Sequence, residues 1–345
     1  MIRGAIALAL LALFALLPLI GVAVGLAWLA LAVTFVAIPL LDAWIGPPRR
    51  DGAVITLPRE VAAWLPRAHV PLQALLLVQA LVLLPQLSFG EAIVFAFAVG
   101  TVTGGIGITV AHELGHRASR LDRMLSKALL VSVGYGHFHV EHNRGHHARV
   151  ATADDPASAP RGMDVYRFML RSVVGSFLHA WRLEALRLRH RGRSPLHPSN
   201  WVLSGTLLWL VLLACAAVVG GAAATAFLLG QALWAVALLE IVNYIEHYGL
   251  RRRRLANGRP EPVAPRHAWN ADFVVSNWLL FNLQLHSDHH AHVERPFETL
   301  RSMPAAPQLP AGYPTMVLVA LLPPLWFALM DRRLPPEAAP AGKAA

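Results

Sequence analysis

Long apolar runs separated by short polar stretches dominate this 345-residue chain as far as residue 246. A helix needs about 20 apolar residues to cross a bilayer, at about 1.5 Å of rise per residue. Six runs are long enough, at residues 4–20, 22–42, 69–86, 90–111, 201–219 and 222–246. The pattern predicts an all-α, polytopic membrane protein with six transmembrane helices. The first run follows Arg3 as a signal peptide would, but apolar sequence resumes after Gly21, which favours a helical hairpin.

Two polar regions, residues 112–200 and 247–345, contain shorter apolar segments. Residues 126–138 and 272–285 are too short to cross a bilayer and predict buried or interfacial helices. Residues 313–330 are interrupted by Pro323 and Pro324, which favours an interfacial segment over a seventh span. We expect one integral-membrane domain over residues 1–330 and a disordered tail over residues 331–345.

Charge predicts the orientation in the membrane. The chain is 56% hydrophobic and 14% charged, with a formal net charge of +10. If the N-terminus is cytoplasmic, the connections near Gly21, Ser88 and Gly220 face away from the cytoplasm and lack Lys and Arg. The basic clusters then face the cytoplasm, as the positive-inside rule requires, so both termini and the polar regions are expected there. Without a recognition motif, this charge indicates attraction to anionic lipid rather than nucleic-acid binding.

Nine of the 17 histidines share one predicted membrane boundary. Eight lie in HELGHR, VEHNRGHH and LQLHSDHHAH, and the ninth, in NYIEHYGL, ends the sixth span where the fourth span also ends. Residues four apart share a helical face, so His112 pairs with His116 and His142 pairs with His146. The nine are His112, His116, His142, His146, His147, His247, His286, His289 and His290.

These clusters predict a metal site. Imidazole is the commonest metal-binding side chain, and uncompensated polar groups near a bilayer are costly. Nine ligands exceed the three or four of a zinc site, so we expect two ions. Imidazole alone does not choose among Zn, Cu, Fe and Ni. The single cysteine, Cys215, excludes disulfides and thiolate clusters.

An acidic residue stands beside a histidine in each group. Neighbours on a helix point about 100° apart, so we expect these acids to hold the second nitrogen of histidines on other helices. Direct bridging of an ion is a second role, and ion pairing with Arg117 and Arg144 is a third. The four acids are Glu113, Glu141, Glu246 and Asp288.

Two other functions use the same residues. HELGH fits the H-E-x-x-H signature of zinc proteases, whose glutamate is the general base, but this leaves seven candidate ligands without a purpose. A histidine-rich metal transporter would need ligands spread along a membrane path, whereas these clusters lie at one level.

HELGHR, EHNRGHHARVATADDPASA, NYIEHYGL and LQLHSDHHAH resemble the three histidine boxes and the HYG motif of the integral-membrane alkane 1-monooxygenases, relatives of the membrane fatty-acid desaturases and hydroxylases. PLLDAWIG extends the likeness, which covers roughly residues 38–330. Three histidine boxes alone indicate only the broad superfamily. DDPASA and NYIEHYGL narrow the resemblance to alkane hydroxylation.

The resemblance implies two non-haem irons held by the nine histidines, hydroxylation of n-alkanes with O2, and a place in the bacterial inner membrane. It also implies rubredoxin as electron donor, reduced by an NAD(P)H-dependent reductase. The alternative is a related di-iron hydroxylase or desaturase acting on acyl chains or methyl-aromatics. Two positions depart from the family, Leu285 for a usual arginine and Arg117 for a common lysine. Neither is a ligand, but Leu285 removes a charge near the metals.

An n-alkane has no polar group, so its recognition requires an apolar channel between the helices. Gly104, Gly105 and Gly107 lie on the run that leads to the first histidine cluster, where they leave room for substrate or allow close helix packing. Trp28 and Trp44 are candidate channel walls or interfacial anchors. A basic run just beyond the sixth span is a candidate rubredoxin docking patch or a topology anchor. It consists of Arg251, Arg252, Arg253 and Arg254.

Overall fold

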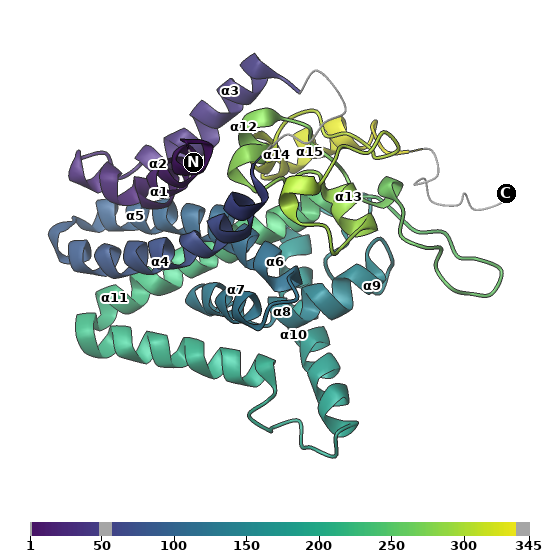
Figure 1. The fold of residues 1–345 in the computed structure, drawn as a ribbon, viewed down its shortest axis with the longest axis horizontal. Helices are drawn as coiled ribbons and strands as arrows, with labels where there is room; N and C mark the ends of the chain where they lie inside the picture. Colours follow the sequence, from purple (N-terminus) through teal and green to yellow (C-terminus); the bar gives the residue numbers. More distant parts are fainter. Residues whose placement is uncertain (1, 48–56, 336–345) are drawn as a thin grey trace.

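The computed structural model describes residues 2–47 and 57–335, in which the regular structure is helical and contains no β-strand. Figure 1 shows the long helices side by side in one bundle, with the shorter C-terminal helices gathered at one end. Helices η1, η3 and η4 are π-helical, and η2, η5 and η6 are 3-10 helices. In chain order the elements are α1 (Ile2–Ala23), α2 (Leu29–Ala32), η1 (Val33–Ala37), α3 (Ile38–Ile45), α4 (Arg59–Leu83), η2 (Leu84–Gln86), α5 (Phe89–Val102), η3 (Thr103–Ile108), α6 (Thr109–His116), α7 (Arg120–Ser132), α8 (Phe138–Glu141), η4 (His142–His146), α9 (His147–Arg149), α10 (Val165–Arg189), α11 (Trp201–His247), η5 (Pro265–His267), α12 (Val274–Leu279), α13 (His286–Ala291), η6 (Phe297–Thr299), α14 (Tyr313–Ala320) and α15 (Pro323–Met330).

Within the described residues, four helices are long and apolar enough to cross a membrane: Gly4–Ala23, Arg59–Gln86, Phe89–His116 and Trp201–His247. The last, α11, has 47 residues and turns back at Gly221, whose φ of 63° suits glycine best. The predicted break between the fifth and sixth runs therefore lies at this residue, and Figure 1 shows two arms diverging from it. The second predicted span is the 17-residue helix Leu29–Ile45, about 25 Å long and shorter than an ordinary span. The third begins at Arg59, ten residues earlier than predicted.

The continuous helix Phe89–His116 forms the centre of the bundle and packs against the second arm of α11. Glycines make this close packing possible. A Cβ on Gly100 would lie 2.6 Å from the backbone oxygen of Gln231, and one on Gly104 would lie 2.7 Å from Cα of Ala235. Such four-residue spacing of small residues brings helix backbones together in membranes. This contact fixes the depth at which the first histidine cluster leaves the apolar part of the bundle.

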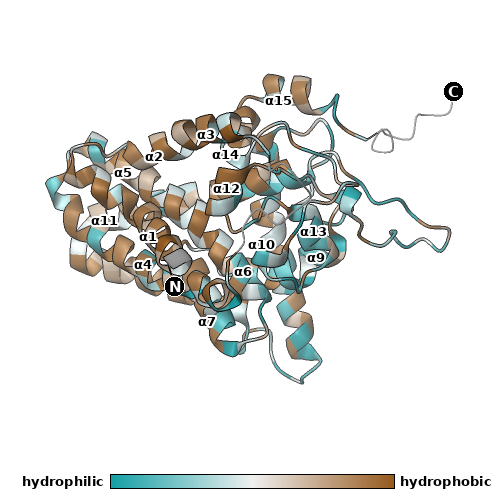
Figure 2. Ribbon diagram, turned by 45° about the horizontal axis from the view of Figure 1, so that its top comes forward, coloured by the Kyte–Doolittle hydropathy of each residue, from teal (hydrophilic) through white to brown (hydrophobic). Residues whose placement is uncertain are grey.

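Hydropathy divides the molecule into two ends. Figure 2 shows hydrophobic residues concentrated on α1, α4, α5 and α11, whereas hydrophilic residues gather around α6, α9 and α13. Many apolar side chains on the first arm of α11 are exposed, including Leu207, Val211 and Val218, as expected of a helix that faces lipid. The structure is therefore that of a membrane protein whose histidines lie at the polar end.

The shorter apolar segments fold differently from one another. The segment predicted at 126–138 contributes to α7, and that at 272–285 forms only the six-residue α12. Residues 313–330 form α14 and α15, each eight residues long and too short to span. Met316 and Trp326 are fully buried, whereas Leu318 and Leu325 are exposed, so the segment packs one face against the protein, and its interfacial position stays a prediction. Asp331, in the predicted tail, accepts a 2.7 Å hydrogen bond from the Tyr248 hydroxyl, whereas residues 336–345 lie outside the described residues.

Candidate metal centre

The nine histidines named above converge at the polar end and divide into two groups. Within each group the potential ligand nitrogens all lie within 4.8 Å of one another. The second group is fully buried, whereas three members of the first are partly accessible. The first group contains His112, His116, His142, His147 and His289, and the second contains His146, His247, His286 and His290.

The spacing of the ring nitrogens suits a metal ion in each group. In the first group, Nε2 of His147 lies 2.9 Å from that of His142 and 3.2 Å from that of His289. In the second, Nε2 of His290 lies 3.0 Å from that of His286 and 3.3 Å from that of His146. Nitrogens bound at about 2.1 Å to one ion would be roughly 3.0–3.4 Å apart. Each imidazole has one Nε2, so the shared inner space suits a cation better than a closed network of ring-to-ring hydrogen bonds.

Local helix geometry directs the three histidines of VEHNRGHH into different groups. We expected His142 and His146 to share a face, as they would on an α-helix. Residues 142–146 instead form the π-helix η4, in which the His147 backbone N–H donates to the His142 carbonyl. This i→i+5 pattern stacks residues five apart, so His142 joins His147 and His146 points into the second group. On α13, His286 and His290 enter the second group, and His289 enters the first.

Burial favours the neutral form of three histidines outside the membrane-spanning helices, whereas the Asp155 carboxylate outweighs burial at His146 and raises the pKa of that imidazole. Burial lowers the pKa of His147, His289 and His290 well below the ordinary value, and neighbouring histidines lower it further. The neutral imidazole has the free lone pair that a metal requires. The low polarity of the site thus prepares it to bind a metal near neutral pH.

Asp155 orients one of the candidate ligands. Its carboxylate is fully buried and accepts hydrogen bonds from His146 Nδ1 at 2.9 Å, the Ser158 hydroxyl at 2.6 Å and the Ala157 backbone N–H at 3.1 Å. A proton held on Nδ1 leaves the His146 Nε2 lone pair directed at the second group. We did not single out Asp155 from the sequence. The signal was the DDPASA segment, which places a carboxylate nine residues after His146.

Three of the four predicted acids bond to residues other than the nine histidines. Glu113 bonds to Arg117 at 3.0 Å, which is the ion-pair role, and Glu141 lies 2.9 Å from Nδ1 of His179. Asp288 contacts three partners near the end of α13: His292, Arg295 and the Arg301 backbone N–H. Among the described residues, none of these three acids bonds to one of the nine histidines, so the structure lends no support to their predicted orienting role.

Glu246 faces the second group directly. One of its oxygens lies 3.2 Å from Nε2 of His286, and the other accepts a 2.9 Å hydrogen bond from the Tyr313 hydroxyl. Nε2 is the nitrogen that points at the inner space of the group, so this carboxylate is placed as a metal-facing oxygen. Tyr313 was absent from the sequence-based site, because nothing near it in the chain marks residues 313–330 as more than an apolar segment.

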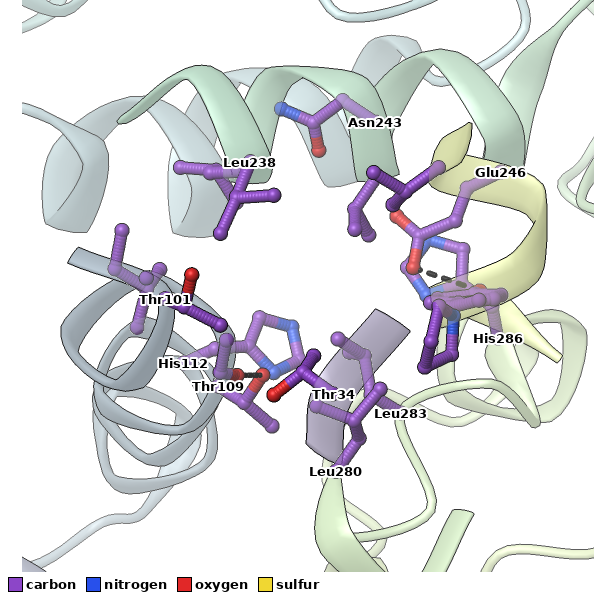
Figure 3. Close-up of a pocket in the computed structure, with 18 of the residues that line it drawn as sticks. Thr34, Thr101, Thr109, His112, Leu238, Asn243, Glu246, Leu280, Leu283 and His286 are labelled. Atoms are coloured by element: carbon purple, nitrogen blue, oxygen red, sulfur yellow. Dashed lines mark hydrogen bonds and ion pairs between the residues drawn. The ribbon is translucent and has the colours of Figure 1, made fainter. Parts of the chain in front are cut away.

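A mostly apolar cavity of about 740 Å³, its open mouth included, leads to the histidines. Figure 3 shows Leu238, Leu280 and Leu283 around it, with His112, Glu246 and His286 at its wall. Thr34 comes from η1, and Gly104 and Gly105 come from η3, so two π-helical segments contribute to the lining. A second apolar cavity shares Thr34, Thr101 and Gly105 with the first and reaches Phe14 and Ile106.

The residues predicted to form the channel have different environments in the structure. Gly104 lines the cavity and also packs against α11, whereas no atom lies within 4 Å of a Cβ on Gly105, which makes Gly105 the more open position. A Cβ on Gly107 would lie 2.1 Å from Oε1 of Gln73, so Gly107 serves helix packing. Trp28 and Trp44 do not line this cavity and are 51% and 83% exposed, which fits the anchor role.

Neither the basic run nor Leu285, which stands where the family usually has arginine, lines the apolar cavity. The run, Arg251 to Arg254, is on a loop that projects from the body in Figure 1. Arg252 donates to the backbone oxygens of Glu261 and Ala148, at 2.6 and 3.1 Å. Leu285 is fully buried at the start of α13, and its carbonyl accepts from the His289 backbone N–H at 3.3 Å. A leucine fits this buried place without a charged partner.

Comparison with known proteins agrees with this geometry. Residues 89–320 match the fatty acid desaturase family. Alkane 1-monooxygenase 2 of Pseudomonas aeruginosa is 42% identical over 320 residues, covering 89% of this chain and 84% of that protein. Alkane 1-monooxygenase 1 of the same organism is 48% identical over 242 residues, 69% of this chain and 62% of that protein. The hydroxylase component of the Pseudomonas putida xylene/toluene monooxygenase is 32% identical over 225 residues, 65% of this chain and 59% of that protein. The chain therefore belongs to the fatty acid desaturase family and, within it, to the alkane 1-monooxygenases.

Proposed function

We propose that this protein hydroxylates the terminal carbon of n-alkanes to 1-alkanols, with O2 as oxidant and rubredoxin as electron donor. One observation carries the proposal: two histidine groups with metal-ligand spacing adjoin the end of a mostly apolar cavity. Each turnover consumes the alkane, O2, two electrons and two protons, and yields the alcohol and water. An NAD(P)H-dependent reductase would reduce the rubredoxin.

The nine histidines suit two non-haem irons, one in each group. Bound iron supplies the redox chemistry with O2 that an unactivated C–H bond requires and that zinc lacks. The first group offers five histidine donors and the second offers four. Asp155 holds His146 in the tautomer and orientation that binding at Nε2 requires.

The cavity orients the substrate. Each buried CH2 group contributes about 0.8 kcal/mol, so an alkane gains affinity along its whole length without a polar contact. His112, His142 and His286 line the cavity, so the chain end reaches both groups. The second cavity can receive the far end of a longer chain past Gly105. The apolar lining also excludes water from the reacting end.

Glu246 is placed to hold a proton beside the cavity. Its carboxyl is 2% exposed and lines the cavity, and the Tyr313 hydroxyl donates to Oε1. The Oε2 atom, which faces His286, is the position at which a proton can be held for the oxygen chemistry. Tyr313 therefore keeps the carboxyl turned toward the second group.

The same geometry disfavours a protease and a transporter. A zinc protease would use Glu113 as general base, but this residue is bound to Arg117, and His112 and His116 share a group with three further histidines. A metal transporter would spread its ligands along a path, whereas these histidines form two compact groups. The similarity to a xylene/toluene monooxygenase component makes a methyl-aromatic the second candidate substrate.

The test combines metal content with product analysis. Purified protein is assayed for iron and zinc, and membranes are supplied with rubredoxin, its reductase, NADH and, separately, octane, palmitate and p-xylene. About two irons per chain and 1-octanol as the main product support the proposal. Iron with 4-methylbenzyl alcohol as the main product would move the substrate class to methyl-aromatics, and zinc without oxidation would reopen the protease hypothesis.

We also propose that the protein lies in a bacterial inner membrane with both termini and the metal centre in the cytoplasm. The basic clusters support this orientation, because none lies in the connections assigned to the opposite side. A reporter enzyme that is active only outside the cytoplasm, inserted after Gly221 or fused to the C-terminus, tests it. Activity is expected for the insertion after Gly221 and not for the C-terminal fusion.

A further inference from the structure

A separate, polar cavity also reaches the histidines. His116, of the first group, lines it at its inner end. Arg144, Glu294 and Arg295 are exposed at its rim, so it opens to the surface. The histidines of the second group are fully buried and do not line it. The first group therefore has a direct polar approach from the surface.

This polar cavity is positively charged. Six basic side chains line it against three acidic ones, and Asp288, which does not line the cavity, is bound to Arg295, so an excess of two positive charges remains. Glu113 is paired with Arg117, and Glu184 is paired with both Arg144 and Arg187. The six are Arg117, Arg123, Lys127, Arg144, Arg187 and Arg295.

Two of these cations, Arg123 and Lys127, have no carboxylate partner among the described residues. The Arg123 guanidinium donates only to the carbonyls of Arg117 and Ala118, at 3.2 and 2.6 Å. The Lys127 ammonium lies 4.3 Å from the ring centroid of Trp201. Burial lowers the pKa of Lys127; Glu184 raises it, and Arg123 lowers it again. An anion placed here would therefore stabilise the lysine cation.

We propose that this cavity, whose lining includes Arg123 and Lys127, docks the acidic face of the one-electron carrier protein that reduces the metal centre. This inference rests on the proposed function, which consumes two electrons per turnover. The carrier loses one electron at each encounter, so two encounters supply the pair. Docking here brings its redox centre toward His116, whereas the run Arg251 to Arg254 lies on a projecting loop with Arg252 bound to backbone oxygens. Opposite charges speed encounter and fix orientation more than they add affinity.

The experiment compares two matched pairs of charge reversals in the full-length protein. One variant carries Arg123→Glu and Lys127→Glu, and the control carries Arg251→Glu and Arg254→Glu. Binding of zinc-substituted, redox-inactive rubredoxin is measured at 20 mM and 300 mM salt, together with the KM for reduced rubredoxin and the iron content. We expect the cavity variant to weaken binding and raise KM about tenfold at low salt, with a smaller effect at high salt. The control should change either value less than twofold.

Further readouts separate the possible failures. Octane hydroxylation driven by a small chemical reductant should be equal in the cavity variant and the wild type, because the metal centre is intact. The single change Lys127→Gln provides a milder test if the double variant folds poorly, with a twofold to threefold rise in KM expected. Unchanged rubredoxin binding in the cavity variant, or a larger loss in the control, overturns the docking site. Absence of hydroxylation with every reductant in the wild type overturns the proposed function instead.

Discussion

Replacing Asp155 by asparagine tests whether a single buried carboxylate orients the second histidine group. The two carboxylate oxygens accept from three donors, His146 Nδ1, the Ser158 hydroxyl and the Ala157 backbone N–H. An asparagine has one carbonyl oxygen and one NH2 group. In either orientation the NH2 group meets a donor, on the Ala157 side or on the His146 side. In the second orientation His146 is driven to protonate Nε2, the nitrogen that must bind metal.

The magnitude follows from these contacts. Loss of a carboxylate that orients a metal-bound histidine typically weakens metal affinity 10- to 100-fold, or about 1.4–2.7 kcal/mol. We expect this loss at the second group alone, because Asp155 contacts none of the five histidines of the first group in the structure. Leaving a buried donor unpaired also costs about 1–3 kcal/mol, so the metal-free variant should unfold at a lower temperature.

Chelator competition measures the effect. Iron-loaded wild type and Asp155→Asn are dialysed against increasing concentrations of a ferrous chelator, and iron per chain is determined. The wild type should lose its two irons over a narrow range, whereas the variant should lose one at 10- to 100-fold lower chelator concentration. Asp154→Asn is the matched control, because Asp154 is adjacent and exposed. An equal weakening of both irons, or a variant that behaves like the control, would refute the orienting role.

Three further predictions concern the metals and the cavity. His247→Ala should reduce iron from about two to about one per chain, measured by elemental analysis; a fully loaded variant would remove His247 from the ligand set. Tyr313→Phe removes the hydrogen bond to Glu246, worth about 0.5–1.5 kcal/mol, and should lower kcat about threefold to tenfold at unchanged iron content, whereas an unchanged kcat would show that the Glu246 position does not limit turnover. Gly105→Leu places a side chain where no atom lies within 4 Å of a Cβ, so hexadecane conversion should fall at least tenfold more than octane conversion; an equal fall for both alkanes would show that long chains do not pass Gly105.

The sequence predicted the candidate ligands because clustered histidines at helical spacing are a local signature of metal binding. Histidines at helical spacing, next to apolar runs, identified nine residues, and the structure gathers the same nine. The length of the apolar runs located the long helices, and the connection predicted near Gly220 coincides with the reversal of α11 at Gly221. These features depend on neighbouring residues along one helix. The local pattern therefore contains the information needed to find them.

The residues that support the histidines or line the cavity from other segments follow no such local pattern. Asp155, Tyr313 and Gly105 were missed or undervalued as site residues, because the contacts that give each its role form only in the folded structure. The spacing had been interpreted with an α-helical period, which pairs His142 with His146. The π-helical turn at residues 142–146 pairs His142 with His147 instead. Glu113 has the alternative role of an ion pair with Arg117, and Asp288 is bound by Arg295, which no helical spacing indicated.

What the sequence by itself determined was therefore the helical membrane architecture and the identity of the nine imidazoles, both of which depend on composition and period along single helices. Only the tertiary structure decided how the imidazoles divide into five and four, which carboxylates support them, and where the apolar and basic cavities meet the site. The physical reason is that these features depend on packing between helices distant in sequence. Small residues such as Gly104 set how closely two helices approach, and that approach determines which side chains meet.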